Sequence, residues 1–139
     1  GSRCVVDIHG DMSRLRCDQC GWRGEAGDWS RLQIPPVCAS CGGVVRPDVV
    51  LFGEMLPMEK LAVLQRELKT GFDMVLSVGT TSVFPYIRGP VEQAAAEGRW
   101  TVEINPGWTE VSRRVDLKIS QRAAPAFDAL YQRIAPAGS

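Results

Sequence analysis

Four cysteines stand in two tight pairs, and their spacing is the strongest chemical signal in the sequence. Cys17 and Cys20 form one Cys-x-x-Cys pair, Cys38 and Cys41 form the other, and seventeen residues separate the pairs. This is the spacing of metal knuckles, in which both thiolates of a pair turn toward one ion. A closed set of four thiolates suits tetrahedral Zn²⁺, so the pattern predicts a structural zinc site. Two disulfides are the alternative, which the short spacing within each pair disfavours.

The fifth cysteine and the single histidine lie outside this pattern. Cys4 belongs to the apolar run Cys4-Val5-Val6, which is typical of a small buried residue. His9 precedes Gly10, and its imidazole is the side chain here that can act as a base near neutral pH without a shifted pKa. A lone histidine is usually just packed or solvated, so position alone does not make His9 catalytic. Metal-binding cysteines favour a reducing, cytoplasmic compartment.

Two loops carry polar groups that suit a sugar or a phosphate. Gly79-Thr80-Thr81-Ser82 offers backbone amides and three hydroxyl groups, and Asn105 opens the turn Asn105-Pro106-Gly107. A generic turn has the same composition, and Asn105 could equally make an Asx turn with Gly107. Both loops are therefore candidate ligand sites that the residues alone do not assign.

A third candidate is the segment Val50-Leu51-Phe52-Gly53-Glu54. If it forms an exposed strand edge, it can pair with an extended peptide through main-chain hydrogen bonds. An ordinary edge strand that ends in a turn has the same sequence pattern.

The elements that must position these residues follow from the residue pattern. The expected strands are 3–8, 46–54, 72–78, 100–104 and 117–120, and the expected helices are 58–69, 86–97 and 125–134, with a brief helix near 27–30. The run 72–78 is too apolar for a strand with one wet face, which predicts a central strand. From residue 46 onward the alternation predicts an α/β fold, a parallel sheet with helices on its faces. Ligands of such sheets bind beyond the carboxyl ends of the strands.

Composition excludes several classes of protein. The 139 residues give room for one domain, and 45% hydrophobic with 23% charged residues is typical of a globular protein. Sixteen basic residues balance sixteen acidic ones, so bulk charge gives no argument for nucleic acid or an anionic membrane. No apolar run approaches the ~20 residues that span a bilayer.

Taken in order, the motifs resemble the C-terminal half of the sirtuin family. The resemblance runs over nearly the whole chain, through Ile8-His9-Gly10, the two cysteine pairs, the run from Arg46 to Pro57, Val78-Gly79-Thr80-Thr81 and Glu103-Ile104-Asn105. Each motif alone is a weak signal, but the collinear set is specific. It implies a zinc-binding module over residues 11–45, with 3–10 and 46–139 forming part of a Rossmann-like NAD-binding domain whose N-terminal half is missing.

The resemblance also implies an activity, that of an NAD-dependent protein lysine deacylase. Such an enzyme transfers the acyl group of acyl-lysine to ADP-ribose and releases nicotinamide. His9 would be the general base on a ribose hydroxyl. Val50, Phe52, Gly53 and Glu54 would bind the acyl-lysine protein or peptide as a strand.

The cofactor residues follow from the same resemblance. Gly79, Thr80 and Thr81 would meet the ribose and phosphates of NAD, and Asn105 the adenosine ribose. Many sirtuins have serine where Thr81 stands, which keeps the hydroxyl group and adds a methyl group.

One departure from the family pattern concerns the front half. The sequence has no Gly-x-Gly-x-x-Gly and none of the motifs with which sirtuins open. We therefore expect this chain alone to lack meaningful deacylase activity and to associate with itself or with a polypeptide that supplies the N-terminal half. The rival interpretation is a non-enzymatic zinc-ribbon interaction module. Such a module would not need His9-Gly10, Phe52-Gly53-Glu54 and Gly79-Thr80 together.

Overall fold

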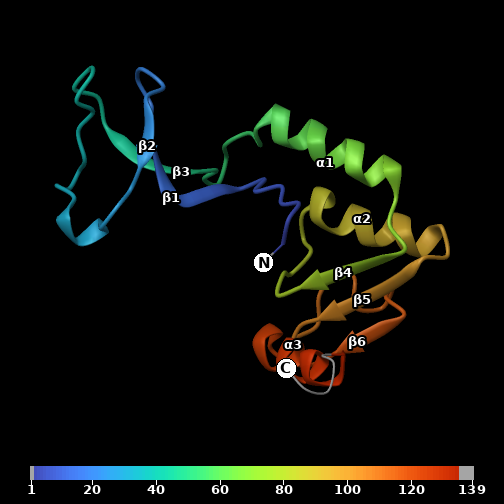
Figure 1. Ribbon diagram of the computed structural model, residues 1–139. Helices are drawn as coiled ribbons and strands as arrows, with labels where there is room; N and C mark the ends of the chain where they lie inside the picture. Colours follow the sequence, from blue (N-terminus) through green and yellow to red (C-terminus); the bar gives the residue numbers. More distant parts are fainter. Residues whose placement is uncertain (1, 135–139) are drawn as a thin grey trace. The chain divides into compact units, whose positions relative to one another are not determined.

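A computed structural model describes residues 2–134 as two compact units with a boundary between Glu67 and Leu68. In chain order the elements are β1 (Gly10–Cys17), β2 (Arg23–Glu25), the short 3₁₀ helix η1 (Trp29–Arg31), β3 (Val45–Val49), α1 (Met58–Thr70), β4 (Met74–Val78), α2 (Pro85–Ala96), β5 (Trp100–Ile104), β6 (Leu117–Ile119) and α3 (Ala123–Ile134) (Figure 1). None of the helices among these residues is long and apolar enough to cross a bilayer.

The first unit is built on a small antiparallel sheet of order β2-β1-β3. Its core contains two of the four paired cysteines and consists of Leu15, Cys17, Ala26, Cys38 and Val45, with Leu32 packed against it. A core of this size buries little apolar surface, so units of this kind need a further source of stability such as a metal ion.

Three expectations for this unit are wrong. The predicted strand 3–8 is not formed, because local hydrogen bonds from Ile8 N to Val6 O (2.9 Å) and from Gly10 N to Asp7 O (2.7 Å) turn the chain there. Cys4 is exposed, not buried. The predicted strand 46–54 ends at Val49, and it pairs with β1 in the antiparallel sheet, not with the parallel one. The extent of the zinc module, residues 11–45, stays a prediction.

The second unit contains the predicted parallel sheet, with strand order β4-β5-β6 (Figure 1). The predicted strand 72–78 is shorter, begins at Met74 and lies at an edge of the described sheet, while β5 is central. Its apolar Met74 and Leu76 are accordingly exposed, at 48% and 43%. β4 therefore combines an edge position with apolar side chains exposed on one face, a surface suited to association.

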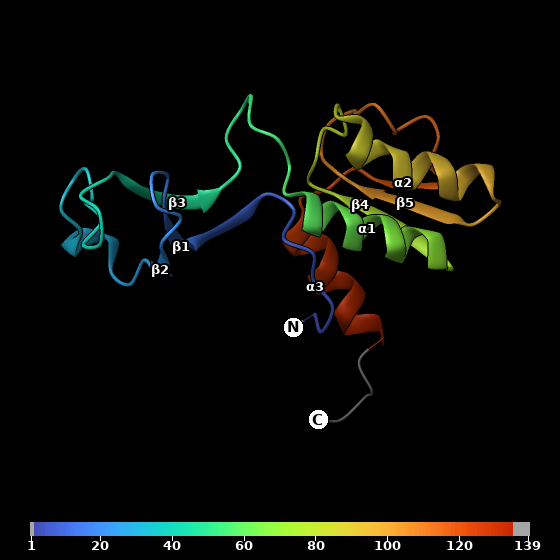
Figure 2. The same cartoon turned by 90° about the horizontal axis from the view of Figure 1, so that it is seen from above.

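The two faces of this sheet carry different helices. On one face, α2 runs along β4 and β5 (Figure 2). Val75 of β4, which pairs with Thr101, lines a small pocket together with Ala94 of α2, so it lies on this face. Val102 and Ile104 point to the other face, where they pack against Ala126 of α3. The alternation of side chains along β5 therefore requires a helix on each face, as the sequence predicted. Pro85 is the first residue of α2, a position where the N–H that proline lacks would have no partner within the helix.

Candidate functional site

The four paired cysteines converge on one point in the first unit. Their sulfur atoms all lie within 4.8 Å of one another. The Sγ atoms of Cys17 and Cys41 are 3.5 Å apart, and those of Cys20 and Cys38 are 3.7 Å apart. A tetrahedron with Zn–S bonds of about 2.3 Å has S–S edges of about 3.8 Å, whereas a disulfide needs about 2.05 Å. The sulfur geometry fits a zinc ion and not two disulfides.

The pKa values of the cysteine thiols also indicate that a cation is needed at this site. The backbone amide of Ser40 is the main cause that lowers the pKa of the Cys38 thiol to about 7. The amide of Gly43 favours ionised Cys41, but neighbouring sulfurs, Cys20 foremost, raise the pKa of Cys41 to about 12. The thiols therefore cannot all ionise together without a counter-ion. A divalent cation removes that repulsion, so the donor set fits structural Zn²⁺.

His9 and Val50, which the sequence predicted as a general base and as a peptide-binding residue, are neighbours. The amide of Val50 donates to the carbonyl oxygen of His9 at 2.9 Å, just beyond the register pair Gly10–Val49 of β1 and β3. Gly10 has φ +87°, and a Cβ at this position would lie 2.0 Å from the carbonyl oxygen of Asp48. Only glycine fits this approach of the two strands, which brings the imidazole-bearing residue beside the predicted peptide segment.

The chain before His9 is held on its other side by α1. Lys60 Nζ lies 2.7 Å from the Asp7 carboxylate and 3.0 Å from the Asp7 carbonyl oxygen. The hydrogen bond from Lys60 is the main cause that lowers the pKa of Asp7. The side chain of His9 is exposed. The backbone of His9 is thus fixed between two elements while its imidazole stays accessible.

The predicted peptide segment is a turn, not a strand. The carboxylate of Glu54 accepts the amide of Leu51 at 3.0 Å, and the amide of Glu54 donates to the Leu51 carbonyl oxygen at 3.0 Å. Gly53 allows this closure with φ +87°. Phe52 projects from the turn with 99% of its surface exposed. An exposed phenylalanine on a fixed turn is available to a ligand.

An ion-pair chain, which sequence reasoning missed, links this turn to the metal knuckle. Arg46 Nε lies 2.7 Å from the carboxylate of Asp18, the residue that follows Cys17, and Arg46 Nη2 lies 2.5 Å from Glu54. Arg46 is 16% exposed at its side chain. The amide of Leu51 first, and then Arg46, lower the pKa of Glu54. Glu54, predicted to bind substrate, uses its carboxylate to shape the turn, and a direct substrate contact stays a prediction.

A cleft of about 770 Å³ opens in this unit beside the turn. Gly10, Val49, Val50 and Glu54 line it, together with apolar Met55 and Met58. Several charged side chains also line it: Arg16, Arg23, Asp48, Glu59 and Lys60. A cleft of this volume is of the size that holds a small ligand or a long side chain.

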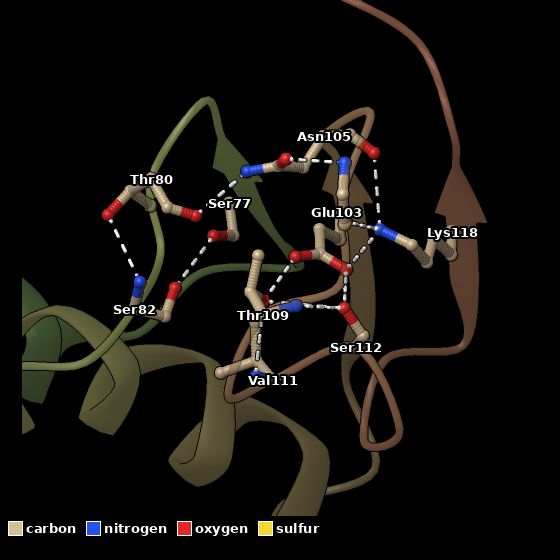
Figure 3. Close-up of polar contacts among 10 residues, drawn as sticks. Ser77, Thr80, Ser82, Glu103, Asn105, Thr109, Val111, Ser112 and Lys118 are labelled. Carbon is tan, nitrogen blue, oxygen red and sulfur yellow. Dashed lines mark hydrogen bonds and ion pairs between the residues drawn. The ribbon is translucent and has the colours of Figure 1, made fainter.

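In the second unit, the two predicted loops meet at the carboxyl ends of β4 and β5. The carboxamide of Asn105 donates from Nδ2 to the Thr80 carbonyl oxygen at 3.0 Å (Figure 3). Gly79, at φ +64°, donates its amide to Ile104 O at 3.0 Å. Asn105 Oδ1 also accepts Gly107 N at 3.0 Å, so the Asx turn exists alongside the inter-loop contact. The parallel sheet thereby collects the predicted ribose and phosphate residues in one place.

The loop after Gly79 is held by a buried serine. Ser82 has no exposed surface and φ 56°, which a residue other than glycine rarely adopts. Its amide donates to Thr80 Oγ1 at 3.2 Å, and its Oγ lies 3.3 Å from Ser77 Oγ. Thr81 is exposed. A strained, over-determined backbone of this kind is common where a loop must present groups to a ligand.

Beneath this edge lies a second network that the sequence did not predict. It joins Glu103, Thr109, Ser112 and Lys118 (Figure 3). The available signal was a charged residue inside the apolar run Trp100–Ile104, since a strand with helices on both faces of its sheet buries the side chains on either face.

One unit carries a four-cysteine centre that fits structural zinc, and the other carries a parallel sheet with polar loops at its carboxyl edge. Together they define an α/β protein with a zinc-ribbon module. The model of the Sir2 family matches residues 1–85, more than half of the 139-residue chain. The chain belongs to the Sir2 family.

Individual relatives agree with this assignment. The chain is 51% identical over 120 residues to "NAD-dependent protein deacylase 2" of Pseudomonas aeruginosa, covering 86% of this chain and 47% of the relative. It is 42% identical to the protein of that name in Pseudomonas syringae pv. tomato, covering 94% and 53%. The crystal structure of a Sir2 homolog–NAD complex superposes with a TM-score of 0.82 at 34% identity, covering 96% of this chain and 52% of that one. The chain thus spans about half the length of the curated relatives it matches.

Proposed function

We propose that the protein containing this chain is an NAD-dependent protein lysine deacylase. The observation that carries the proposal is the hydrogen bond from Val50 to His9, which places the chain's one histidine beside an exposed turn and beside Val50, a residue that lines a cleft. Membership of the Sir2 family and the names of the relatives support the proposal. No observation favours a non-enzymatic interaction module, which has no use for this juxtaposition.

The residues of the first unit would handle the acyl-lysine substrate. Val50 and the turn with Phe52, Gly53 and Glu54 would bind the peptide and line the path of its acyl-lysine side chain. A ring nitrogen of His9 would take the proton of a ribose hydroxyl, making that oxygen a nucleophile toward the acyl carbon. The zinc ion would hold the knuckles in place and take no part in the chemistry, because four sulfurs leave it no open position.

The residues of the second unit would hold NAD, which supplies the ADP-ribosyl group that accepts the acyl group. Gly79, Thr80 and Thr81 offer amides and hydroxyl groups for the ribose and phosphates, and Asn105 would hydrogen-bond the adenosine ribose. The solved Sir2 homolog–NAD complex, 34% identical, supports this assignment.

Two further proposals concern partners and location. The exposed edge strand β4, in a chain half the length of its relatives, would be extended by strands of a second polypeptide segment or of another copy. We place the protein in the cytoplasm, because thiolate ligands persist in a reducing compartment.

The test uses the full-length protein with NAD and an acyl-lysine peptide. We expect peptide-dependent release of nicotinamide and formation of O-acyl-ADP-ribose, measured by mass spectrometry. His9→Ala should lower kcat about 10²- to 10⁴-fold, the range for loss of a general base, while zinc content stays unchanged. Cys4→Ser, which alters an exposed residue outside the site, is the matched control. Full activity of His9→Ala would contradict the proposal, and zinc-loaded protein without turnover would favour the interaction module.

A further inference from the structure

A carboxylate without access to solvent lies beneath the edge that carries Asn105. Glu103, the residue before the end of β5, is 0% exposed. Its oxygens accept hydrogen bonds from Thr109 Oγ1, from Ser112 Oγ at 2.6 Å and from Lys118 Nζ at 3.0 Å (Figure 3). A buried carboxylate is tolerated only when it is paired and hydrogen-bonded, and these donors satisfy that condition.

The ammonium group of Lys118 directs its other donors at the turn that follows Asn105. Nζ lies 3.2 Å from the carbonyl oxygen of Asn105 and 2.7 Å from that of Gly107. An ammonium group has three donors, and these two carbonyl groups with Glu103 use all of them. The Lys118 side chain is 14% exposed, and its Nζ lies 5.7 Å from the ring centroid of Trp108. Lys118 is therefore a largely buried charge that links Glu103 to the turn after Asn105.

The same turn determines where the Asn105 carboxamide points. Oδ1 accepts Gly107 N and Nδ2 donates to Thr80 O, both at 3.0 Å. A carboxamide has two N–H donors and two lone pairs on oxygen, so one of each remains for a ligand. The direction of these remaining groups depends on the backbone of residues 105–107, which Lys118 holds at two carbonyl oxygens.

We propose that Lys118, anchored by buried Glu103, is a positioning residue that sets the affinity for the ADP-ribose part of NAD. The inference rests on the proposed function, because it assumes that Asn105 meets the adenosine ribose. Glu103 acts only through the ammonium group and the Thr109 and Ser112 hydroxyl groups. The whole network lies in the second unit, so the affinity for peptide and the binding of zinc do not depend on it.

Lys118→Met in the full-length protein tests this inference. We expect the Kd for ADP-ribose, measured by calorimetry, and the KM for NAD to rise on the order of tenfold, the effect of losing a charge-assisted hydrogen bond. The KM for the acyl-lysine peptide and the zinc content should not change. Lys69→Met, which removes an exposed lysine of α1, is the matched control and should leave all four quantities unchanged.

A second variant keeps the test decisive if Lys118→Met does not fold. Lys118→Arg retains the charge beside Glu103, but a planar guanidinium group cannot aim its donors at three converging oxygens, so a smaller rise of both constants is expected. Unchanged ADP-ribose affinity in the folded variants, or equal rises of the KM for NAD and for peptide, would overturn the inference. Wild-type protein that binds ADP-ribose but does not deacylate contradicts the proposed function and leaves the calorimetric test valid.

Discussion

The amide of Val50 donates a hydrogen bond to the carbonyl oxygen of His9 at 2.9 Å, across forty-one positions of sequence. The pairing of β1 with β3 produces this contact, because His9 and Val50 lie just beyond the terminal register pair, Gly10 with Val49. His9 and the proposed peptide-binding segment are fixed by one strand pair, so we expect them to move together.

Gly10→Ala should damage the deacylase activity of the full-length protein without removing any reactive group. The added Cβ would lie 2.0 Å from Asp48 O at a backbone φ of +87°, so β1 and β3 must separate. We expect kcat/KM to fall at least about tenfold and stability to fall by about 1–3 kcal/mol. Gly98→Ala is the matched control, since φ is +71° there and nothing lies within 4 Å. Equal activity of the two variants would contradict the coupling.

Removal of zinc should unfold the first unit and leave the parallel sheet of the second unit folded. The core of the first unit includes Cys17 and Cys38, and binding of a structural metal is itself folding free energy. Hydrogen exchange with and without a strong chelator should show lost protection in β1 and β3 and retained protection in β5. Cys41→Ser should behave like chelation, and Cys4→Ser like the wild type. Chelation that strips the metal without a change in exchange would refute this role.

Glu54→Gln should weaken peptide binding selectively. The carboxylate receives the Leu51 amide and Arg46, so the neutral side chain loosens the turn that presents Phe52. We expect the KM for the acyl-lysine peptide to rise on the order of tenfold, as for one charge-assisted hydrogen bond, with the KM for NAD unchanged. Glu67→Gln, at an exposed carboxylate paired with its neighbour Arg66, is the control. A rise of the KM for NAD instead would show that the turn does not act on the peptide.

Buried Glu103 should make the second unit sensitive to acid. Burial by itself raises the pKa of this carboxyl, but hydrogen bonds from Ser112, Thr109 and Lys118 outweigh it and hold the pKa below the ordinary value of 4.5. The folded state then binds fewer protons than the unfolded state. The stabilisation is therefore complete above pH 4.5 and declines as the pH falls through the lowered pKa.

Protection factors of the β5 amides, measured from about pH 7 to about pH 3.5, check this pH dependence. The difference in protection between the wild type and Glu103→Gln should be largest near neutral pH and shrink in acid. A difference that does not change with pH would mean that Glu103 is not ionised in the folded protein.

The 139-residue chain alone should turn over acyl-lysine peptide far more slowly than the full-length protein. It holds about half the length of its relatives and no Gly-x-Gly-x-x-Gly phosphate loop. We expect nicotinamide release well below about 1 per second, the lower range of typical enzymes. A rate at or above that value in the isolated chain would show that these residues suffice for catalysis.

The sequence by itself predicted the features that depend on local spacing. Two residues between paired cysteines dictate metal knuckles. The alternation from residue 46 onward predicted a parallel sheet with helices on its faces, which the structure confirms for the strands after residue 72. The sequence also pointed to the loops at Gly79 and Asn105 as candidate ligand sites, because ligands of parallel sheets bind beyond the carboxyl ends of the strands. Each of these follows from short-range geometry or from one rule of sheet topology.

Strand pairing was beyond the sequence, because residues 46–54 have the same β pattern whether they join a parallel or an antiparallel sheet. Only the tertiary structure shows that Val45–Val49 pairs with β1 and that Glu54 closes a turn. It also shows that residues 3–8 form no strand. The same holds for charged residues, whose partners depend on distant backbone positions. The spacing of the four cysteines determined a zinc site from the sequence alone. The ion pairs of Arg46 with Asp18 and Glu54, and of Lys118 with Glu103, exist only because folding brings separate segments into contact.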